Sequence, residues 1–320
     1  MTGCEKLEER IGRQMGKTAF IFPGQGAQYS GMGKDFFDNF ETARRVYATA
    51  GEATGLDVAE LCFTENADLD VTEYTQIAML VTEVAILKVL EEKGLKADCA
   101  AGLSLGEYGA LAAAGVMELP QLFWLIRCRG IFMQEAYPSG GAMSAVLGLD
   151  AETIGRICRE TEGIVSIAND NCPGQIVITG EAQAVQAASE KLAGAGAKRC
   201  IPLKVSGPFH SKLLAGAGEK LAAELEGISV HAPKIPYLCN VEADYVTESG
   251  KIKELLVRQV SSTVRWRETM ERMLADGVDT FVEIGPGRTL AGFLRKMNRD
   301  VKVLNVAKVE DMAAVPGQTP

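Results

Sequence analysis

The residues best suited to chemistry lie in the pentapeptide GLSLG (102–106), a G-x-S-x-G pattern with Ser104 at its centre. A short strand is expected just before it (98–101), and a helix is expected after it through Ala114. In this setting the glycines permit a strained turn that exposes the serine hydroxyl. The helix amino terminus offers N–H groups to a developing oxyanion. A pattern with three fixed positions can also recur by chance in a glycine-rich chain, but the strand-turn-helix setting favours Ser104 as a nucleophile.

A serine at its free pKa is a weak nucleophile and needs a base. The chain has only two histidines, His210 and His231. His210 lies in the glycine-proline loop VSGPFHS, which favours it as the base over His231, beside an expected extended segment. The partner that orients the histidine stays open, because a hydrolase triad takes an acid between serine and histidine, and Asp150 and Asp170 both qualify.

Two arginines lie in the segment LFWLIRCRGIFM, part of a helix expected from about Leu119 to Ala136. We expect Arg127 to be a surface residue of that helix. Arg129 has two interpretations: another surface arginine, or a guanidinium that faces the serine. In the second case it would bind a substrate carboxylate through two parallel hydrogen bonds.

The glycine-rich segment FPGQGAQ follows the first expected strand (18–22), but it does not match a phosphate-binding loop. A dinucleotide fingerprint starting at Gly24 needs glycine where this chain has Tyr29. A P-loop ending at Gly33-Lys34 needs glycine at position 28, where this chain has Gln28, and serine or threonine at position 35, where it has Asp35. Both nucleotide interpretations fail.

The order of the expected elements predicts an α/β protein with two domains. Residues 35–92 are expected to be mainly helical, with an apolar stripe along one helix face at Ile77, Leu80, Val81, Val84 and Leu87. Residues 142–205 follow the order β-α-β-β-α-β, which is typical of a ferredoxin-like unit. We expect a small ferredoxin-like domain (138–205) inserted in a larger α/β domain (17–137 and 206–310), with terminal extensions at 1–16 and 311–320.

Composition narrows the class of protein. The 320 residues allow about two domains, and 47% apolar with 23% charged residues is ordinary for a globular protein. A net charge of −9 argues against a nucleic-acid or membrane-surface partner. The eight cysteines form no C-x-x-C pair, which indicates buried thiols rather than zinc ligands or disulfides. With no signal peptide and no long apolar run, we expect a soluble cytoplasmic protein.

Seven segments in order resemble the malonyl-CoA:acyl carrier protein transacylase family over roughly residues 17–310: FPGQGAQ, GLSLGEY, RGIFMQEA, NDNCPGQIVITG, VSGPFHSKLL, VRQVSSTVRW and VEIGPGRTL. The resemblance implies an α/β-hydrolase-like large domain with the ferredoxin-like insertion. It implies transfer of a malonyl group from malonyl-CoA to the phosphopantetheine thiol of acyl carrier protein. A malonyl-serine intermediate and a ping-pong mechanism follow, with no metal or redox cofactor.

The resemblance also implies residue roles. Ser104 would be the nucleophile and His210 its base, and Arg129 would bind the malonyl carboxylate. Gln259 would orient the histidine through its main-chain carbonyl, in place of a triad acid. The other expected substrate-binding residues are Gln25 and Leu105, as oxyanion N–H donors, with Met133, Asn169 and Phe209, and Gln175 near them.

Two positions bear on rate and specificity. The family commonly has histidine before the serine, whereas this chain has Leu103, so typical rates do not follow from the resemblance. Phe209 matches the malonyl-type version of its loop, and its bulk is expected to crowd an α-methyl branch.

Other interpretations stay open. The same elbow could serve a serine esterase or thioesterase, and the chain could be a non-catalytic module that binds a carrier protein. The motifs do not distinguish a carrier protein of fatty-acid synthesis from one of polyketide synthesis. A basic cluster near the carboxyl end is either a solvated helix face or the dock for an acidic carrier protein: Arg288, Arg295, Lys296, Arg299 and Lys302.

Overall fold

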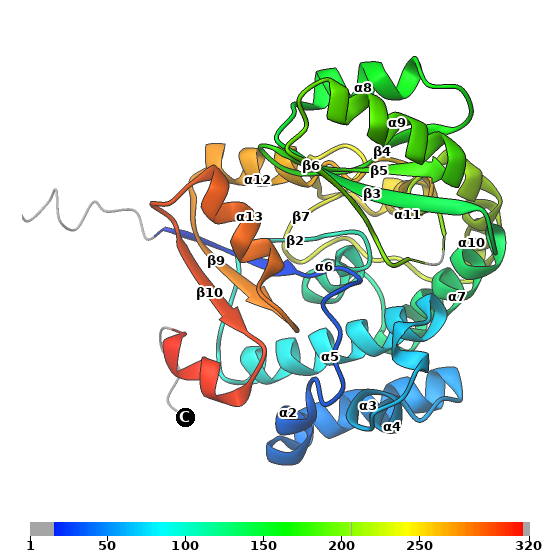
Figure 1. Cartoon of the computed structure of the whole chain (residues 1–320). Coiled ribbons are helices and arrows are strands. Elements are labelled where there is room, and N and C mark those ends of the chain that lie inside the picture. Colours follow the sequence, from blue (N-terminus) through cyan, green and yellow to red (C-terminus); the bar gives the residue numbers. More distant parts are fainter. Residues whose placement is uncertain (1–15, 206, 316–320) are drawn as a thin grey trace, which may run out of the picture.

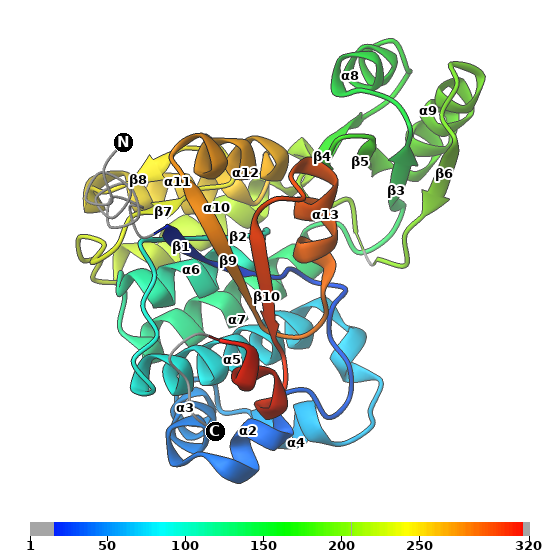
Figure 2. The same cartoon turned by 90° about the vertical axis from the view of Figure 1, so that its left-hand side faces the viewer.

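A six-stranded sheet lies at the centre of the structure, a computed structural model that describes residues 16–205 and 207–315. Its strand order is β10-β9-β1-β2-β7-β8, and all neighbours are parallel except the last pair, which is antiparallel (Figure 1, and Figure 2 for the labels of β1 and β8). The strands are β1 (Lys17–Phe22), β2 (Cys99–Gly102), β7 (Tyr237–Leu238), β8 (Tyr245–Val246), β9 (Val278–Ile284) and β10 (Lys302–Val306).

Both faces of this sheet are covered, as the continuous apolar run of β1 requires. Side chains alternate along a strand, so Phe20 and Phe22 enter one core and Ala19 and Ile21 enter another. The first core includes residues of α5 (Thr72–Glu92) and α6 (Gly106–Ala114), and the second includes residues of α12 (Trp266–Ala275) and α13 (Thr289–Met297). The sheet is therefore the middle layer of three.

Helix α5 differs from its expected amphipathic form. The stripe predicts one buried face, yet Thr82 and Glu83, which lie off that stripe, are buried as well. The reason is tertiary: α5 is packed against α3 (Glu41–Thr54), α6 and α7 (Leu119–Ala136), so residues 75–87 are all buried (Figure 1). The other helical elements of this region are α2 (Lys34–Asn39), α3 (Glu41–Thr54), α4 (Val58–Phe63) and η1 (Asp68–Asp70).

A second, four-stranded antiparallel sheet has the order β4-β5-β3-β6. Helices α8 and α9 pack on one face through a separate apolar cluster. From the opposite face, Met143, Ala145 and Val177 join the core of the large sheet's helices. Figure 2 shows this unit extending from one corner of the larger one. Its elements are β3 (Gly141–Leu147), α8 (Ala151–Arg159), β4 (Val165–Cys172), β5 (Gln175–Glu181), α9 (Ala182–Gly194) and β6 (Arg199–Pro202).

The segment after β10 is more ordered than the sequence suggests. Residues 311–315, the described part of the expected terminal extension, belong to or directly follow η4 (Val309–Ala314), and Met312 and Val315 are buried. Asp35 of α2 accepts a hydrogen bond from the Val309 N–H at 2.7 Å, which fixes this segment against the helical layer. The expectation for residues 1–15 lies outside the described residues.

The remaining elements precede and follow the short β7–β8 pair. They are η2 (Lys212–Leu214), α10 (Ala215–Glu226), η3 (Ser249–Lys251) and α11 (Ile252–Gln259). None of the helices in the described ranges has the length and apolar character needed to cross a membrane.

Candidate active site

Ser104 lies in the tight turn between β2 and α6 and has a positive φ of 56°. The turn needs both flanking glycines. A Cβ on Gly102 would lie 1.9 Å from the carbonyl carbon of Gly106, and a Cβ on Gly106 would lie 2.2 Å from the main-chain oxygen of Phe22. The strand, turn and helix expected from the motif are therefore present, and the turn holds the serine in a left-handed conformation that is strained for a residue with a side chain.

The histidine expected to be the base is placed by the loop that follows the small sheet. The Nε2 atom of His210 lies 2.7 Å from the Oγ of Ser104. The Nδ1 atom lies 3.0 Å from the main-chain oxygen of Gln259. A carbonyl only accepts, so Nδ1 carries the hydrogen and Nε2 is free to accept the serine proton. His210 itself has a positive φ of 60°, so both residues of this hydrogen-bonded pair occupy strained backbone positions.

The acids left open by the sequence do not orient this histidine. Asp150 caps α8 by accepting from the Thr153 N–H at 2.8 Å. Asp170 forms an ion pair with Arg267 at 2.9 Å. The partner of Nδ1 in the structure is therefore a main-chain carbonyl and not a carboxylate.

Burial and the nearby guanidinium of Arg129 lower the pKa of His210 to about 4. We expect the rate at which a neutral fluorophosphonate labels Ser104 to stay constant as the pH falls to about 5. It should then reach half its value near pH 4, because only then is the imidazole protonated. A half-point near 6.5, the ordinary value for histidine, would contradict this assignment.

The same shift affects stability. The folded-state pKa lies below the unfolded value of about 6.5, so the unfolded chain takes up this proton first. His210 therefore lowers the free energy of unfolding as the pH falls from about 6.5 to about 4, and has no such effect at higher pH.

Arg129 faces the serine and is only 1% exposed. Its Nη2 donates to the Oγ of Ser104 at 3.1 Å and to the Oε1 of Gln259 at 3.0 Å, and its Nη1 donates to the Oε1 of Gln76 at 2.6 Å. No carboxylate is among these partners. The guanidinium is thus a buried cation that a substrate carboxylate beside Ser104 can reach.

The surface position expected for Arg127 is wrong. Its side chain is 12% exposed and forms an ion pair with Glu73 at 2.9 Å. It also donates to the Glu73 main-chain oxygen and stacks over the Tyr74 ring. The side chain is buried because α7 and α5 both lie inside the helical layer, and its contacts connect the two helices.

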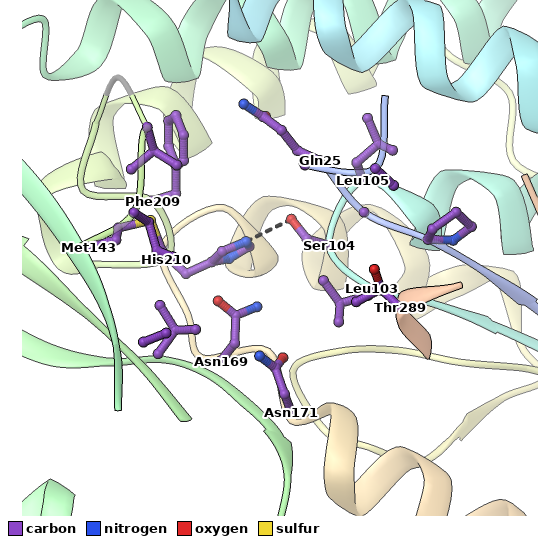
Figure 3. A pocket seen from close by; sticks show the side chains of 18 of the residues that line it. Gln25, Leu103, Ser104, Leu105, Met143, Asn169, Asn171, Phe209, His210 and Thr289 are labelled. Atoms are coloured by element: carbon purple, nitrogen blue, oxygen red, sulfur yellow. Dashed lines mark hydrogen bonds between the residues drawn. The ribbon is translucent and has the colours of Figure 1, made fainter. Parts of the chain in front are cut away.

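One pocket contains nearly all of the expected site residues (Figure 3). Gln259 lies behind it, against the histidine. Within the described ranges, no hydrogen bond is made by the main-chain N–H of Gln25 or of Leu105, so both are free to bind an oxyanion. The expected residues that line the pocket are Gln25, Ser104, Leu105, Arg129, Met133, Asn169, Gln175, Phe209 and His210.

Sequence reasoning missed a second group of polar residues around the pocket. Asn240 accepts from the Ser104 N–H at 2.7 Å and donates to the Gly102 oxygen at 2.7 Å, which fixes the elbow. Gln76 holds Arg129, and Asn171 lines the pocket. The sequence signal for such residues is a polar side chain within an apolar stretch, as at Gln76. Their contacts join segments far apart in the chain, so the sequence does not reveal their partners.

No group of three or more histidine, cysteine, aspartate or glutamate side chains suited to a metal ion occurs in the described part of the chain. The chemistry that this arrangement supports is transfer of an acyl group to and from Ser104. Such transfer needs a nucleophile, a base, two N–H donors and, for an acidic acyl group, a cation.

Comparisons with known proteins agree with this chemistry. The acyl transferase domain family matches residues 19–317. A malonyl CoA-acyl carrier protein transacylase of Bacillus subtilis (strain 168) is 44% identical over 92% of this chain and 95% of its own. The crystal structure of the protein of that name from Clostridium perfringens superposes with a TM-score of 0.90 at 44% identity, covering 93% of this chain and 95% of the other.

A third relative was solved with its partner. It is a malonyl-transacylase in complex with a type II PKS acyl-carrier protein. It superposes with a TM-score of 0.89 at 42% identity and covers 92% of this chain and 97% of its own.

Proposed function

This chain belongs to the acyl transferase family and moves malonyl groups from malonyl-CoA to acyl carrier protein, and we propose that it does so through an ester of Ser104. The main support for this proposal is the position of the serine Oγ, which lies within hydrogen-bond distance of both the imidazole of His210 and the buried guanidinium of Arg129. His210 Nε2 lies 2.7 Å away and Arg129 Nη2 lies 3.1 Å away.

In the first half-reaction, His210 accepts the proton of Ser104 while Oγ attacks the thioester carbonyl of malonyl-CoA. The N–H groups of Gln25 and Leu105 stabilise the oxyanion. The C–S bond then breaks, and the CoA sulfur leaves with the proton held by His210. Arg129 binds the malonyl carboxylate through two charge-assisted hydrogen bonds.

In the second half-reaction, the phosphopantetheine thiol of the carrier protein gives its proton to His210 and attacks the malonyl ester. The Oγ of Ser104 leaves and regains a proton from the imidazolium. Each step uses only this chain's residues and the two thiols, so we propose that no metal or redox cofactor takes part and that malonyl-CoA is a substrate only.

The architecture supports a division into the two expected domains. The order β3-α8-β4-β5-α9-β6, with antiparallel strands arranged β4-β5-β3-β6, is that of a ferredoxin-like unit. We assign residues 138–205 to it and residues 17–137 and 206–310 to an α/β-hydrolase-like catalytic domain. Unpaired cysteines throughout the described residues support a reducing compartment, and we propose a cytoplasmic location.

Steady-state kinetics test the covalent intermediate. We expect parallel double-reciprocal plots when malonyl-CoA and holo-carrier protein are varied together, because CoA leaves before the carrier protein reacts. Intersecting plots would mean direct transfer. Release of malonate at a rate that the carrier protein does not change would instead indicate a thioesterase.

We propose that α13 provides part of the carrier-protein dock. Thr289, Leu290 and Phe293 of this helix line the pocket, while Arg295 and Arg299, at and beyond its end, are exposed. Lys296 is also exposed and donates to Gln175 across the pocket rim at 2.9 Å. An acidic partner that approaches the pocket therefore meets positive charge at its edge.

Reversing Arg295 and Arg299 to glutamate is expected to raise the KM for carrier protein about tenfold at low salt, with a smaller effect at high salt. Lys296 is left in place because it contacts Gln175. Transfer to free pantetheine, a neutral acceptor, should not change. The matched control reverses Lys17 and Lys96, which are exposed at the amino-terminal ends of the central strands β1 and β2, whereas the pocket lies at their carboxyl ends. An unchanged KM in the α13 variant, or an equal rise in the control, would exclude this dock.

A further inference from the structure

A layer of buried polar groups lies beneath the reactive serine, and Glu107 is its only carboxylate within hydrogen-bond distance of Gln259 in the described structure. Glu107 belongs to α6, three residues after Ser104, and is fully buried. Its Oε2 accepts from Gln259 Nε2 at 2.7 Å and from the Asn240 N–H at 3.0 Å. None of the roles given above to Ser104, His210 or Arg129 involves it.

We propose that Glu107 is a positioning residue that orients the Arg129 guanidinium through the side chain of Gln259, and so contributes to the selection of malonyl over acetyl groups. This inference rests on the role proposed above for Arg129.

The amide of Gln259 connects the two charged residues in a defined orientation. Its Nε2 faces only acceptors: Glu107 Oε2, the main-chain oxygen of Ser104 at 2.9 Å and the Oδ1 of Asn240 at 3.4 Å. Its Oε1 therefore faces Arg129 and accepts from Nη2 at 3.0 Å. If the amide rotated by half a turn, its NH2 group would face the guanidinium, donor against donor. The three acceptors oppose that rotation together, and Glu107 Oε2 makes the shortest contact of the three.

The guanidinium is thereby held at both ends. Gln76 fixes Nη1, and Gln259 fixes Nη2 beside the Oγ of Ser104. Two parallel hydrogen bonds to a carboxylate require the plane of the guanidinium to match the plane of the carboxylate. A malonyl group needs this alignment, whereas an acetyl group has no carboxylate to align. An error in the orientation of Arg129 therefore reduces malonyl transfer selectively.

The acceptor atom, rather than the charge, is the functional feature of Glu107. Burial raises its pKa to about 7, so both protonation states are populated at neutral pH. Its Oε1 has no hydrogen-bond partner among the described residues and can hold the proton while Oε2 continues to accept. The titratable groups that face Glu107 are Arg129, Tyr108, Tyr237 and Cys239. A glutamine at this position keeps an acceptor and is expected to keep the alignment.

The test compares kcat/KM for malonyl-CoA and acetyl-CoA in Glu107→Met, which keeps the volume but removes both acceptor oxygens. We expect the malonyl-to-acetyl ratio to fall about 10- to 100-fold, the usual effect of losing one hydrogen bond to a charged group. Glu107→Gln should retain the ratio to within about threefold. In an Arg129→Ala background, Glu107→Met should not change the ratio further.

The matched control is Glu83→Met. Glu83 is also fully buried, and neither of its carboxylate oxygens has a hydrogen-bond partner in the described part of the structure. It belongs to α5 and contacts none of the proposed catalytic residues through a hydrogen bond. We expect the wild-type ratio from this variant.

An equal loss with both thioesters in Glu107→Met, or a loss of ratio that persists in the Arg129→Ala background, would overturn the inference. If Glu107→Met does not fold, Gln259→Met tests the inference in its place. This variant removes the amide that connects Glu107 to Arg129 but keeps the main-chain oxygen that holds His210. It should lower the ratio by a similar factor, and an unchanged ratio would contradict us. Failure of the proposed function is a different result, in which neither the wild type nor Glu83→Met transfers malonyl groups.

Discussion

Replacing Ser104 with alanine is expected to lower kcat/KM for malonyl transfer by a factor on the order of 10⁶. His210→Ala should cost a similar factor, because the hydroxyl and its base act as one unit, 2.7 Å apart. For the same reason the double variant should be little worse than either single variant. The measurement is initial-rate transfer from malonyl-CoA to holo-carrier protein.

Binding of the carrier protein, measured by calorimetry, provides the control for this prediction. Ser104→Ala removes one oxygen, and Oγ accepts only from Arg129 and donates only to His210 in the described structure. We therefore expect the variant to fold and to bind carrier protein as the wild type does. Substantial transfer by Ser104→Ala would mean that another residue is the nucleophile. Binding with no transfer in the wild type would identify a non-catalytic module.

Arg129→Ala is expected to lower transition-state stabilisation for malonyl transfer by about 2–5 kcal/mol, the usual effect of breaking a buried charge pair. A malonyl group carries one carboxylate more than an acetyl group, and burying that charge without a partner is unfavourable. Acetyl transfer should stay equal or improve, because the variant no longer leaves a buried guanidinium without its anion. Arg129→Lys should restore malonyl transfer only in part, since an ammonium cannot form two parallel hydrogen bonds.

The kinetic measurement for this prediction is kcat/KM for both thioesters in both variants. The free energy of unfolding should also be measured, because Gln76 and Gln259 lose a buried partner when Arg129 is removed. Equal losses for malonyl and acetyl groups would mean that Arg129 supports the fold rather than the substrate.

The parts of the site that follow local sequence rules could be predicted. The elbow at Ser104 depends on two glycines and a strand-turn-helix pattern within a few residues, and the structure contains it. Helix α7 begins at Leu119 and ends at Ala136, as its apolar pattern indicates. His210 could be preferred because the chain offers only two histidines and His210 lies in a glycine-proline loop. The structure places the other, His231, at the surface.

The parts that depend on distant contacts could not be predicted. The group that orients His210 is a main-chain oxygen, which every residue has, so nothing in the residue types distinguished Gln259 from Asp150 or Asp170. Only the resemblance to a known family pointed to it. The burial of the middle of α5 and of most of the Arg127 side chain depends on the helices that surround them. A stripe on one helix face does not reveal how many neighbours the helix has.

Glu107 is a further residue whose contacts could not be predicted from the sequence. A single glutamate among the small residues of α6 is visible in the sequence, but its partners are about 130 and 150 residues away. Folding alone brings Asn240 and Gln259 to it.

Rapid-quench mass spectrometry on the wild type tests the central claim most directly. Mixing the protein with malonyl-CoA alone should place one malonyl group on the peptide that contains Ser104. Adding holo-carrier protein should remove that group as an equal amount of malonyl-carrier protein forms, faster than free malonate is released. A protein without the adduct, an adduct on another residue, or an adduct lost to water at the same rate with and without carrier protein would contradict the account.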